Sequence, residues 1–214
     1  MRSSRHFAAL LAETCAARVL NVGYRNAPEH PYPAALTDVV NAYRGLIDGG
    51  ADPGTIAFVG NSAGGGLTLA CLLALRDAGD PLPVCAAVIS PWTDLTNSGP
   101  SIRTNAATEV MLDPGSIDST AALYASSDEL TNPYVSPLFG DPTGLPALLV
   151  HVSGAEILLD DSLRFVQRCK AADVDVTLHV EPHMPHVWHL FAGLLPEADD
   201  AMTRLGLWLL DRLP

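Results

Sequence analysis

The sequence predicts an α/β fold in which helices cover both faces of a mostly parallel sheet. Short apolar runs rich in Val, Ile and Leu alternate with segments whose apolar residues recur every three or four positions. The short runs lack strict polar–apolar alternation, which is typical of parallel strands buried on both faces. With 48% apolar and 17% charged residues, the 214-residue chain can build one domain with a sizeable core.

Strands and helices are expected in turn along the chain. The apolar runs predict strands at Val19–Tyr24, Thr55–Gly60, Val84–Ser90, Ala147–Ser153 and Val176–Glu181. Helical stripes after the first and second strands hold Leu36, Val39, Val40, Tyr43 and Ile47, and then Leu67, Ala70, Cys71 and Ala74. Later stripes hold Leu163, Val166 and Cys169 and, in a last helix over Glu197–Leu213, Met202, Leu205 and Leu209.

Residues Leu95–Gly144 interrupt this alternation. They are rich in Ser, Thr, Asn, Asp, Gly and Pro, with a weak helical pattern near Ile117–Ser126. A connection of this length inside a compact domain is usually a lid or a binding insertion. We therefore expect residues 95–144 to form a lid within a single domain that spans residues 1–214.

Charge and hydropathy argue against several classes of protein. Acids outnumber bases by 24 to 12 and no Lys/Arg run occurs, so no nucleic-acid partner is expected. The longest apolar stretch, Leu67–Leu75, is far shorter than the roughly 20 residues that span a bilayer. The run Phe7–Ala12 is too short for a secretory signal, which favours the cytoplasm. The cysteines lack metal spacing and are expected in the core: Cys15, Cys71, Cys85 and Cys169.

The segment Gly60-Asn61-Ser62-Ala63-Gly64 lies between a predicted strand and a predicted helix. A serine on such a sharp strand-to-helix turn projects above the sheet edge, and small neighbours permit the turn. The first amides of the helix, beginning with that of Ala63, then suit a developing oxyanion. This context predicts that Ser62 is a nucleophile, with a plain glycine turn as the alternative.

A serine nucleophile needs a base, and the base needs an orienting carboxylate. Glu156 follows the predicted strand Ala147–Ser153, at the edge of the sheet where α/β proteins build their sites. We therefore expect Glu156 to be the acid. Asp160 is the alternative, although Asp160 and Asp161 suit the first turn of the next helix better.

The base is expected in the segment after the strand Val176–Glu181. This segment contains His183, His186 and His189, of which His186 stands between a Pro-containing loop and a helix. We interpret His186 as the base. A zinc site at the three histidines is the alternative, but the sequence marks no further ligand, so no metal is expected. His151 is expected to be a hydrogen-bonded core residue.

Together these residues resemble the hormone-sensitive-lipase family of α/β-hydrolase esterases, also called bacterial family IV. The segment Tyr24–Leu36 matches the family pattern Y-R-x-A-P-E-x-x-x-P-A-A, and Pro91-Trp92-Thr93-Asp94-Leu95 and Met184-Pro185-His186 follow in the expected order. The resemblance implies hydrolysis of a small-molecule ester with a short acyl chain, without any cofactor. It also implies that Tyr24, Arg25 and Glu29 brace the sheet through an ion pair and a turn. Members of this family often form homodimers through the last strand and helix, and the oligomeric state of this chain stays open.

The resemblance also indicates where substrate would be bound. Asn61 stands where the family usually has Asp and is expected at the substrate site. Met111, Tyr124 and Trp188 are expected to line the acyl and alcohol pockets, with core packing as the alternative for each.

The chain departs from the family pattern at the oxyanion hole. The family carries an upstream His-Gly-Gly-Gly loop whose amides supply most of the hole, and no such tetrad occurs in this sequence. Residues 3–17 resemble the family helix that follows this loop, so the chain is expected to be a truncated or mis-started esterase without its N-terminal strands. A strand absent from the sequence would then lie between Val19–Tyr24 and Thr55–Gly60, and both are expected to show an unpaired edge.

Two further hypotheses stay open beside the esterase. The first is a non-catalytic binder, as in the plant gibberellin receptors, which resemble this family but lack the catalytic His. The second is an inactive fragment of the fold. Loss of one oxyanion donor typically lowers a rate about 10²–10³-fold, which favours these hypotheses. The presence of Ser62, Glu156 and His186 favours the enzyme.

Overall fold

The structure, a computed structural model, describes residues 2–214 and contains a parallel sheet. Its strands lie in the order β1–β2–β3–β4, with β1 at Ala57–Asn61, β2 at Cys85–Ile89, β3 at Ala147–Ser153 and β4 at Val176–Glu181. These four strands lie where the apolar runs predicted them. The predicted α/β fold class is therefore confirmed.

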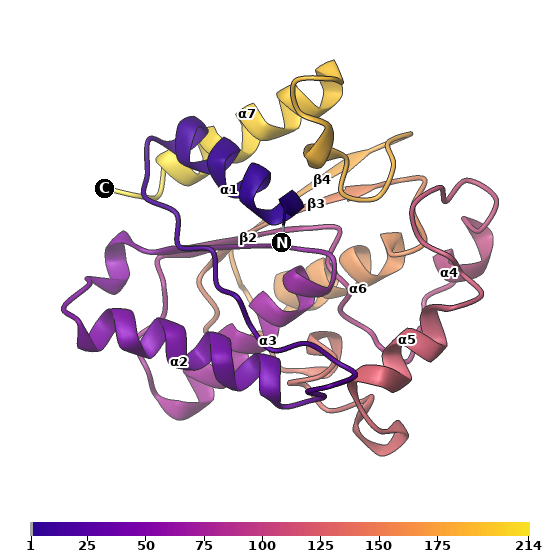
Figure 1. The fold of residues 1–214 in the computed structure, drawn as a ribbon, viewed down its shortest axis with the longest axis horizontal. Coiled ribbons are helices and arrows are strands. Elements are labelled where there is room, and N and C mark those ends of the chain that lie inside the picture. The colour runs from indigo at the N-terminus through magenta and orange to yellow at the C-terminus, as the bar shows by residue number, and fades with distance from the viewer. Residues whose placement is uncertain (1) are drawn as a thin grey trace.

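Helices cover both faces of this sheet (Figure 1). One face carries α1 (Arg2–Cys15) and α7 (Pro196–Leu210), which pack against each other. On the other face α3 (Ala63–Ala78) and α6 (Leu159–Ala171) contact the strands, and α2 (Ala34–Asp48) packs against α3. The expected helix over residues 3–17 thus corresponds to α1, and the predicted apolar stripes lie on α2, α3, α6 and α7.

The central strands explain why the apolar runs lack alternation. Every residue of β2 is buried. Successive side chains of the strand point to opposite faces of the sheet, and helices cover both faces. Val88 joins Phe165 in the apolar cluster under α3 and α6. The next residue, Ile89, joins Leu205 in the cluster under α1 and α7. Burial on both faces therefore produces a continuous apolar sequence.

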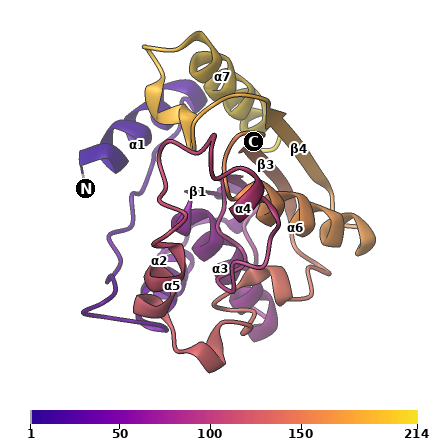
Figure 2. The same ribbon diagram turned by 90° about the vertical axis from the view of Figure 1, so that its right-hand side faces the viewer.

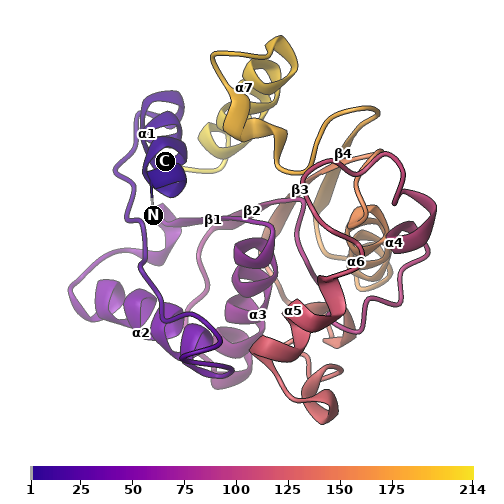
Figure 3. The ribbon, with the colours of Figure 1, turned by 45° about the vertical axis from the view of Figure 1, so that its right-hand side comes forward.

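The predicted strand Val19–Tyr24 is wrong. This segment has no regular secondary structure and links α1 to α2 (Figure 3). Val19 is 40% exposed and Leu20 is 61% exposed. A strand requires a hydrogen-bonded neighbour, and within residues 2–214 the edge strand β1 pairs with β2 alone. The unpaired edge expected at Thr55–Gly60 is therefore present at β1, whereas Val19–Tyr24 forms no strand.

The ion pair expected around Arg25 and Glu29 has a different acidic partner. The Arg25 guanidinium binds Asp38 of α2, with Nη2 2.7 Å from Oδ1, and the backbone N–H of Arg25 donates to Asp38 Oδ2 at 2.9 Å. Asp38 can receive both groups because it lies in the second turn of α2, facing the segment that leads into that helix. The ion pair anchors the Tyr24–Arg25 segment to α2.

Residues 95–144 form an irregular layer with its own apolar cluster. The layer contains α4 (Ser101–Thr104), α5 (Ile117–Tyr124) and the short 3₁₀ turns Ser127–Glu129 and Pro137–Phe139; 3₁₀ turns also occur at Pro53–Thr55 and Trp188–Phe191. Figure 2 shows α4 and α5 toward the viewer, at the right-hand end of Figure 1. Ile102, Ile117 and Val135 of this layer pack with Ile157 and Leu158, which follow β3. A role for this layer as a lid stays a prediction.

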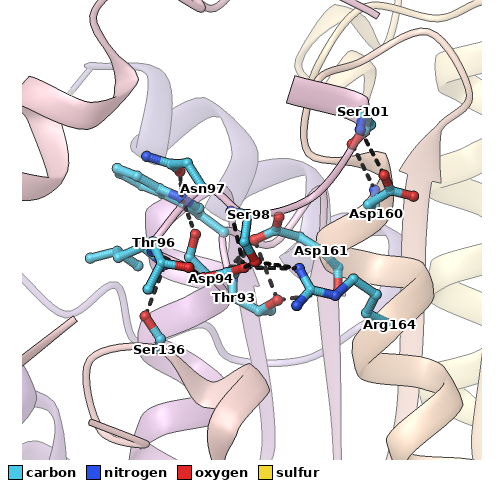
Figure 4. Close-up of polar contacts among 12 residues, drawn as sticks. Thr93, Asp94, Thr96, Asn97, Ser98, Ser101, Ser136, Asp160, Asp161 and Arg164 are labelled. Carbon is cyan, nitrogen blue, oxygen red and sulfur yellow. Dashed lines mark hydrogen bonds and ion pairs between the residues drawn. The ribbon is translucent and has the colours of Figure 1, made fainter. Parts of the chain in front are cut away.

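A buried polar network ties the loop after β2 to α6 (Figure 4). Asp161 Oδ2 accepts the backbone N–H groups of Thr93 at 2.6 Å and Asp94 at 2.8 Å. The Asp94 carboxylate in turn accepts Nη1 of Arg164 at 2.8 Å. Asp160 Oδ2 accepts the backbone N–H of Ser101 at 2.6 Å, which holds the start of α4. The two acids thus lie in the first turn of α6, as predicted, and fix the loops around it.

The structure bears on the sequence expectations about membrane spans and about the cysteines. None of the helices between residues 2 and 214 is long and apolar enough to span a bilayer. All four cysteines are buried and free, at Cys15, Cys71, Cys85 and Cys169. Their predicted positions in the core are confirmed.

Candidate active site

Ser62 lies on a tight turn between β1 and α3. Its φ of 52° and ψ of −126° place it in the left-handed region, which is strained for a residue with a side chain. Its backbone N–H donates to the carbonyl of Ile89 at 2.9 Å. A Cβ at Gly60 would collide with Gly64 and Thr68, and one at Gly66 would collide with the Trp92 carbonyl. The glycines of the sequence motif therefore let strand, turn and helix approach closely.

His186 connects Ser62 to Glu156 by hydrogen bonds. The imidazole Nε2 lies 2.8 Å from Ser62 Oγ, and Nδ1 lies 3.2 Å from Glu156 Oε1. The side chain of His186 is 6% exposed and that of Glu156 is fully buried. These contacts assign the tautomer in which Nδ1–H donates to the carboxylate and Nε2 accepts the serine proton. The structure thus brings together the three residues predicted as nucleophile, base and acid.

The second oxygen of Glu156 is also held. Its Oε2 accepts the Ser90 hydroxyl at 2.7 Å and the backbone N–H of Ser153 at 3.1 Å. Ser153 is the last residue of β3, and Ser90 directly follows the end of β2. Because a buried carboxylate needs partners for both oxygens, these contacts orient Glu156 toward His186.

The other histidines of the segment lie away from Ser62. His183 is exposed, whereas His189 is buried and its Nε2 lies 2.8 Å from Nδ1 of His151. Burial lowers the pKa of His151 to about 2 and that of His189 to about 3, so both rings are neutral. Their outer nitrogens, His151 Nε2 and His189 Nδ1, have no partner. His151 is therefore in the core as expected, but only one of its ring nitrogens is hydrogen-bonded.

A mostly apolar cavity of about 200 Å³ lies beside the turn that carries Ser62 and is lined by the next residue, Ala63. Ala63 and Tyr124 line it, together with Gly66, Leu67 and Trp92. Tyr124 is thus at the position expected of a pocket residue. Ala63 is exposed and is the first residue of α3, so its N–H has no acceptor within the helix.

The remaining pocket residues predicted from the sequence do not line this cavity. Trp188 is 1% exposed and stacks on His151, where it lines a different cavity on the β4 side of the sheet. Its indole Nε1 donates to the carbonyl of Glu197 at 3.3 Å. Met111 is 50% exposed and Asn61 ends β1, directly before the nucleophile. The predicted pocket role of Trp188 is corrected to packing, because the chain turns back into the core after His186.

Sequence reasoning missed two residues that contact the acid. Ser90 and Ser153 are both buried at the carboxyl ends of strands. Each is a single hydroxyl that ends an otherwise apolar run, next to the edge where α/β proteins build their sites. That pattern was available in the sequence and could have identified both residues.

The structure described for residues 2–214 assembles no set of metal-ligating side chains. Among residues 2–214, no three His, Cys, Asp or Glu side chains are placed to hold a metal ion together. The geometry instead suits acyl transfer, in which a serine, an imidazole and a carboxylate form one hydrogen-bonded chain.

Comparison with known proteins identifies the family. A family model described as an alpha/beta hydrolase fold matches residues 1–190. The chain belongs to this family. An acetyl-hydrolase of Streptomyces hygroscopicus is 43% identical over 208 residues, which cover 97% of this chain and 70% of that protein. An esterase of Acinetobacter venetianus is 36% identical, over 92% of this chain and 65% of that protein.

A solved structure places this α/β hydrolase more narrowly. The crystal structure of an esterase from the bacterial hormone-sensitive lipase family superposes with a TM-score of 0.97 at 45% identity. The match covers 100% of this chain and 72% of that one. The resemblance inferred from the motifs is therefore confirmed, and the hydrolase spans between 65% and 72% of the lengths of these three proteins.

Proposed function

We propose that this hydrolase cleaves short-chain carboxylic esters through a covalent acyl-enzyme, with Ser62 as nucleophile, His186 as base and Glu156 as orienting acid. The observation that carries the proposal is the unbroken chain of hydrogen bonds from Ser62 Oγ through His186 to Glu156. The names of the relatives, an acetyl-hydrolase and an esterase, support the same reaction class.

The reaction follows from the positions of these groups. Ser62 Oγ attacks the ester carbonyl carbon while His186 Nε2 takes the hydroxyl proton. Glu156 stabilises the imidazolium that forms, and His186 then gives the proton to the departing alcohol. Water, deprotonated by His186, attacks the acyl-serine and releases the carboxylic acid. Ser62 regains its proton at the end of the cycle.

The Ala63 N–H is the oxyanion donor that we assign among residues 2–214. It stands at the positive end of the α3 dipole, one residue after the nucleophile. The 214-residue sequence contains no His-Gly-Gly tract to supply further donors. Each oxyanion donor is worth about 10²–10³ in rate, so the Ala63 N–H is expected to contribute substantially to turnover.

The mostly apolar cavity lined by Ala63 favours a second candidate function, a binding module that holds an ester or a related ligand without turnover. The cavity beside Ser62 would then be the binding site. A binder predicts no steady-state release of product, whereas the esterase predicts repeated turnover. A partial enzyme that reacts once would release one equivalent of alcohol and then stop.

The cavity supports a small acyl group. Its volume of about 200 Å³ lies below the roughly 300–1,000 Å³ typical of pockets for larger ligands. Its walls are mostly aliphatic and aromatic, and Tyr24 and Thr120 are among the residues that line it. Acetyl to butyryl esters are therefore expected to react faster than decanoyl esters.

Hydrolysis of p-nitrophenyl acetate, butyrate and decanoate tests the proposal. The wild-type protein is expected to release p-nitrophenol from the short esters over many turnovers. The Ser62→Ala variant is expected to show only the background rate. Equal rates for the two proteins would overturn the proposed function.

We further propose a cytoplasmic homodimer. The four free, buried cysteines suit a reducing compartment. The edge strand β4 exposes Val180, and Leu207 and Leu210 of α7 are exposed on the adjoining layer. Size-exclusion chromatography with light scattering should give twice the 22.6 kDa chain mass.

A further inference from the structure

We infer that Ser90 is a positioning residue for the active site, which holds the catalytic acid and the segment of the catalytic base in one geometry. This inference rests on the proposed function of Ser62, His186 and Glu156. Ser90 has no place in the proton transfers themselves. It acts through Glu156.

The Ser90 hydroxyl joins two catalytic loops that come from different strands. Its O–H donates to Glu156 Oε2 at 2.7 Å, and its oxygen accepts the backbone N–H of Val187 at 3.3 Å. Glu156 follows β3, and Val187 is the residue directly after His186. One side chain at the end of β2 therefore links the acid to the backbone that carries the base.

The backbone of Ser90 is also constrained. Its φ of 49° lies in the left-handed region, and its N–H donates to the carbonyl of His151 at 2.7 Å. Ser90 is fully buried, so no water competes for its hydroxyl. Strained residues that are retained in a buried position cluster at functional sites. The strained backbone directs the Ser90 hydroxyl at Glu156 Oε2, which would otherwise accept only the hydrogen bond from the Ser153 N–H.

The charge on Glu156 makes this contact important. A hydrogen bond to a carboxylate in a buried site is stronger than one between neutral groups. Without the hydroxyl, Oε2 would keep only the Ser153 N–H, and Val187 N–H would lose its acceptor. The carboxylate and the imidazole would then be free to shift relative to Ser62.

Ser162 provides a matched control. It is fully buried like Ser90, but its hydroxyl has no hydrogen-bond partner. Ser90→Ala and Ser162→Ala therefore delete the same atom from equally buried sites. Ser90→Gly is a second deletion whose backbone tolerates the positive φ, so it separates loss of the hydroxyl from a failure to fold. Ser90→Cys returns a weak donor at the same place.

Steady-state kinetics on p-nitrophenyl acetate test the inference. Ser90→Ala and Ser90→Gly are expected to lower kcat about tenfold to a hundredfold with KM nearly unchanged, since a hydrogen bond to a charged group is lost. Ser90→Cys should recover part of the loss, and Ser162→Ala should match the wild type. Unchanged kcat in both Ser90 deletions, or an equal loss in Ser162→Ala, would overturn the inference.

Proton NMR keeps this test separate from the proposed function. The Nδ1–H proton of His186, assigned by its absence in His186→Ala, is expected to shift in Ser90→Gly and not in Ser162→Ala. If the wild type has no esterase activity but this proton still shifts, the proposed function fails and the positioning role stands. An unchanged resonance in Ser90→Gly would contradict the positioning role.

Discussion

His186 Nε2 lies 2.8 Å from Ser62 Oγ, although 124 positions separate the two residues in the sequence. The contact forms because two parallel strands end at the same edge of the sheet. Ser62 follows β1, and His186 follows β4 at the opposite side of the sheet. The loop after β3 supplies Glu156 between them, so the order of strands assembles the site.

Removal of the negative charge on Glu156 should slow the reaction strongly. In Glu156→Gln the amide cannot stabilise the imidazolium, and its NH₂ group faces donors where the carboxylate accepted two hydrogen bonds. By analogy with the acid of other serine hydrolases, kcat should fall roughly 10³–10⁴-fold with a small change in KM. The exposed Glu197 offers the same substitution as a control, and Glu197→Gln should retain full activity. A loss below about threefold in Glu156→Gln would remove Glu156 from the triad.

The buried Asp161 should make stability depend on pH. Burial raises the pKa of Asp161 to about 7, although the backbone N–H groups of Asp94 and Thr93 oppose the rise. Asp94, whose own carboxylate faces this site with Arg164, adds a like charge. Because the folded pKa is raised, the stabilising contribution is complete below about pH 4 and is lost as the pH rises through about 7.

Urea unfolding of the wild type and Asp161→Asn across this range measures that dependence. The free energy of unfolding of the wild type, relative to the variant, should fall by a few kcal/mol as the pH rises. Asn at this position carries no charge, so the free energy of unfolding of the variant lacks this pH dependence. Parallel pH profiles for the two proteins would show that Asp161 keeps its charge when buried.

The histidine pair His151 and His189 should remain neutral in the folded protein under mild acid. Burial lowers both pKa values, to about 2 and about 3, while the unfolded chain takes up protons near the ordinary value of 6.5. The pair therefore contributes stability above about pH 6.5 that is lost as the pH falls toward the folded values. Imidazole ¹⁵N shifts of the two rings should stay constant from about pH 8 to the onset of acid unfolding. An inflection between about pH 5 and pH 7 in the native state would contradict the burial argument.

A methyl group at Gly66 should disrupt the nucleophile turn. Its Cβ would overlap the carbonyl of Trp92, which the backbone cannot move without displacing the loop after β2. Gly66→Ala is expected to destabilise the fold by about 3 kcal/mol or more, measured by urea unfolding. Gly45 in α2 has open space around its Cα, so Gly45→Ala should stabilise the protein by about 0.5–1 kcal/mol. Similar stabilities for both variants would show that the turn can relax around a side chain.

The sequence predicted those elements whose signals are local. The stripes of α2 and α3, and the serine between a strand and a glycine-rich helix, depend on residues close together in the chain. Glu156 and His186 could be placed because parallel strands end at a common edge. The strand order β1–β2–β3–β4 places consecutive strands side by side, as is usual for strands that follow one another in the sequence.

The predictions that the structure corrects depend on contacts between residues that are distant in the sequence. Val19–Tyr24 has the composition of a strand, but a strand exists only beside another one, and β1 leaves that edge unpaired within residues 2–214. Trp188 follows His186 by two positions, yet the turn at Val187, with a φ of 53°, directs Trp188 into the core. The partner of Arg25 likewise depends on how α2 packs and not on the nearest acid.

Covalent labelling with a fluorophosphonate probe, followed by peptide mass spectrometry, tests the central claim most directly. The probe needs an activated serine but no complete catalytic cycle, so it reports on Ser62 even where turnover is slow. The structure predicts one phosphonyl group per chain, attached to Ser62, with labelling greatly slowed in His186→Ala. An unlabelled wild-type protein, or a label on any other residue, would contradict the assignment of Ser62 as the nucleophile.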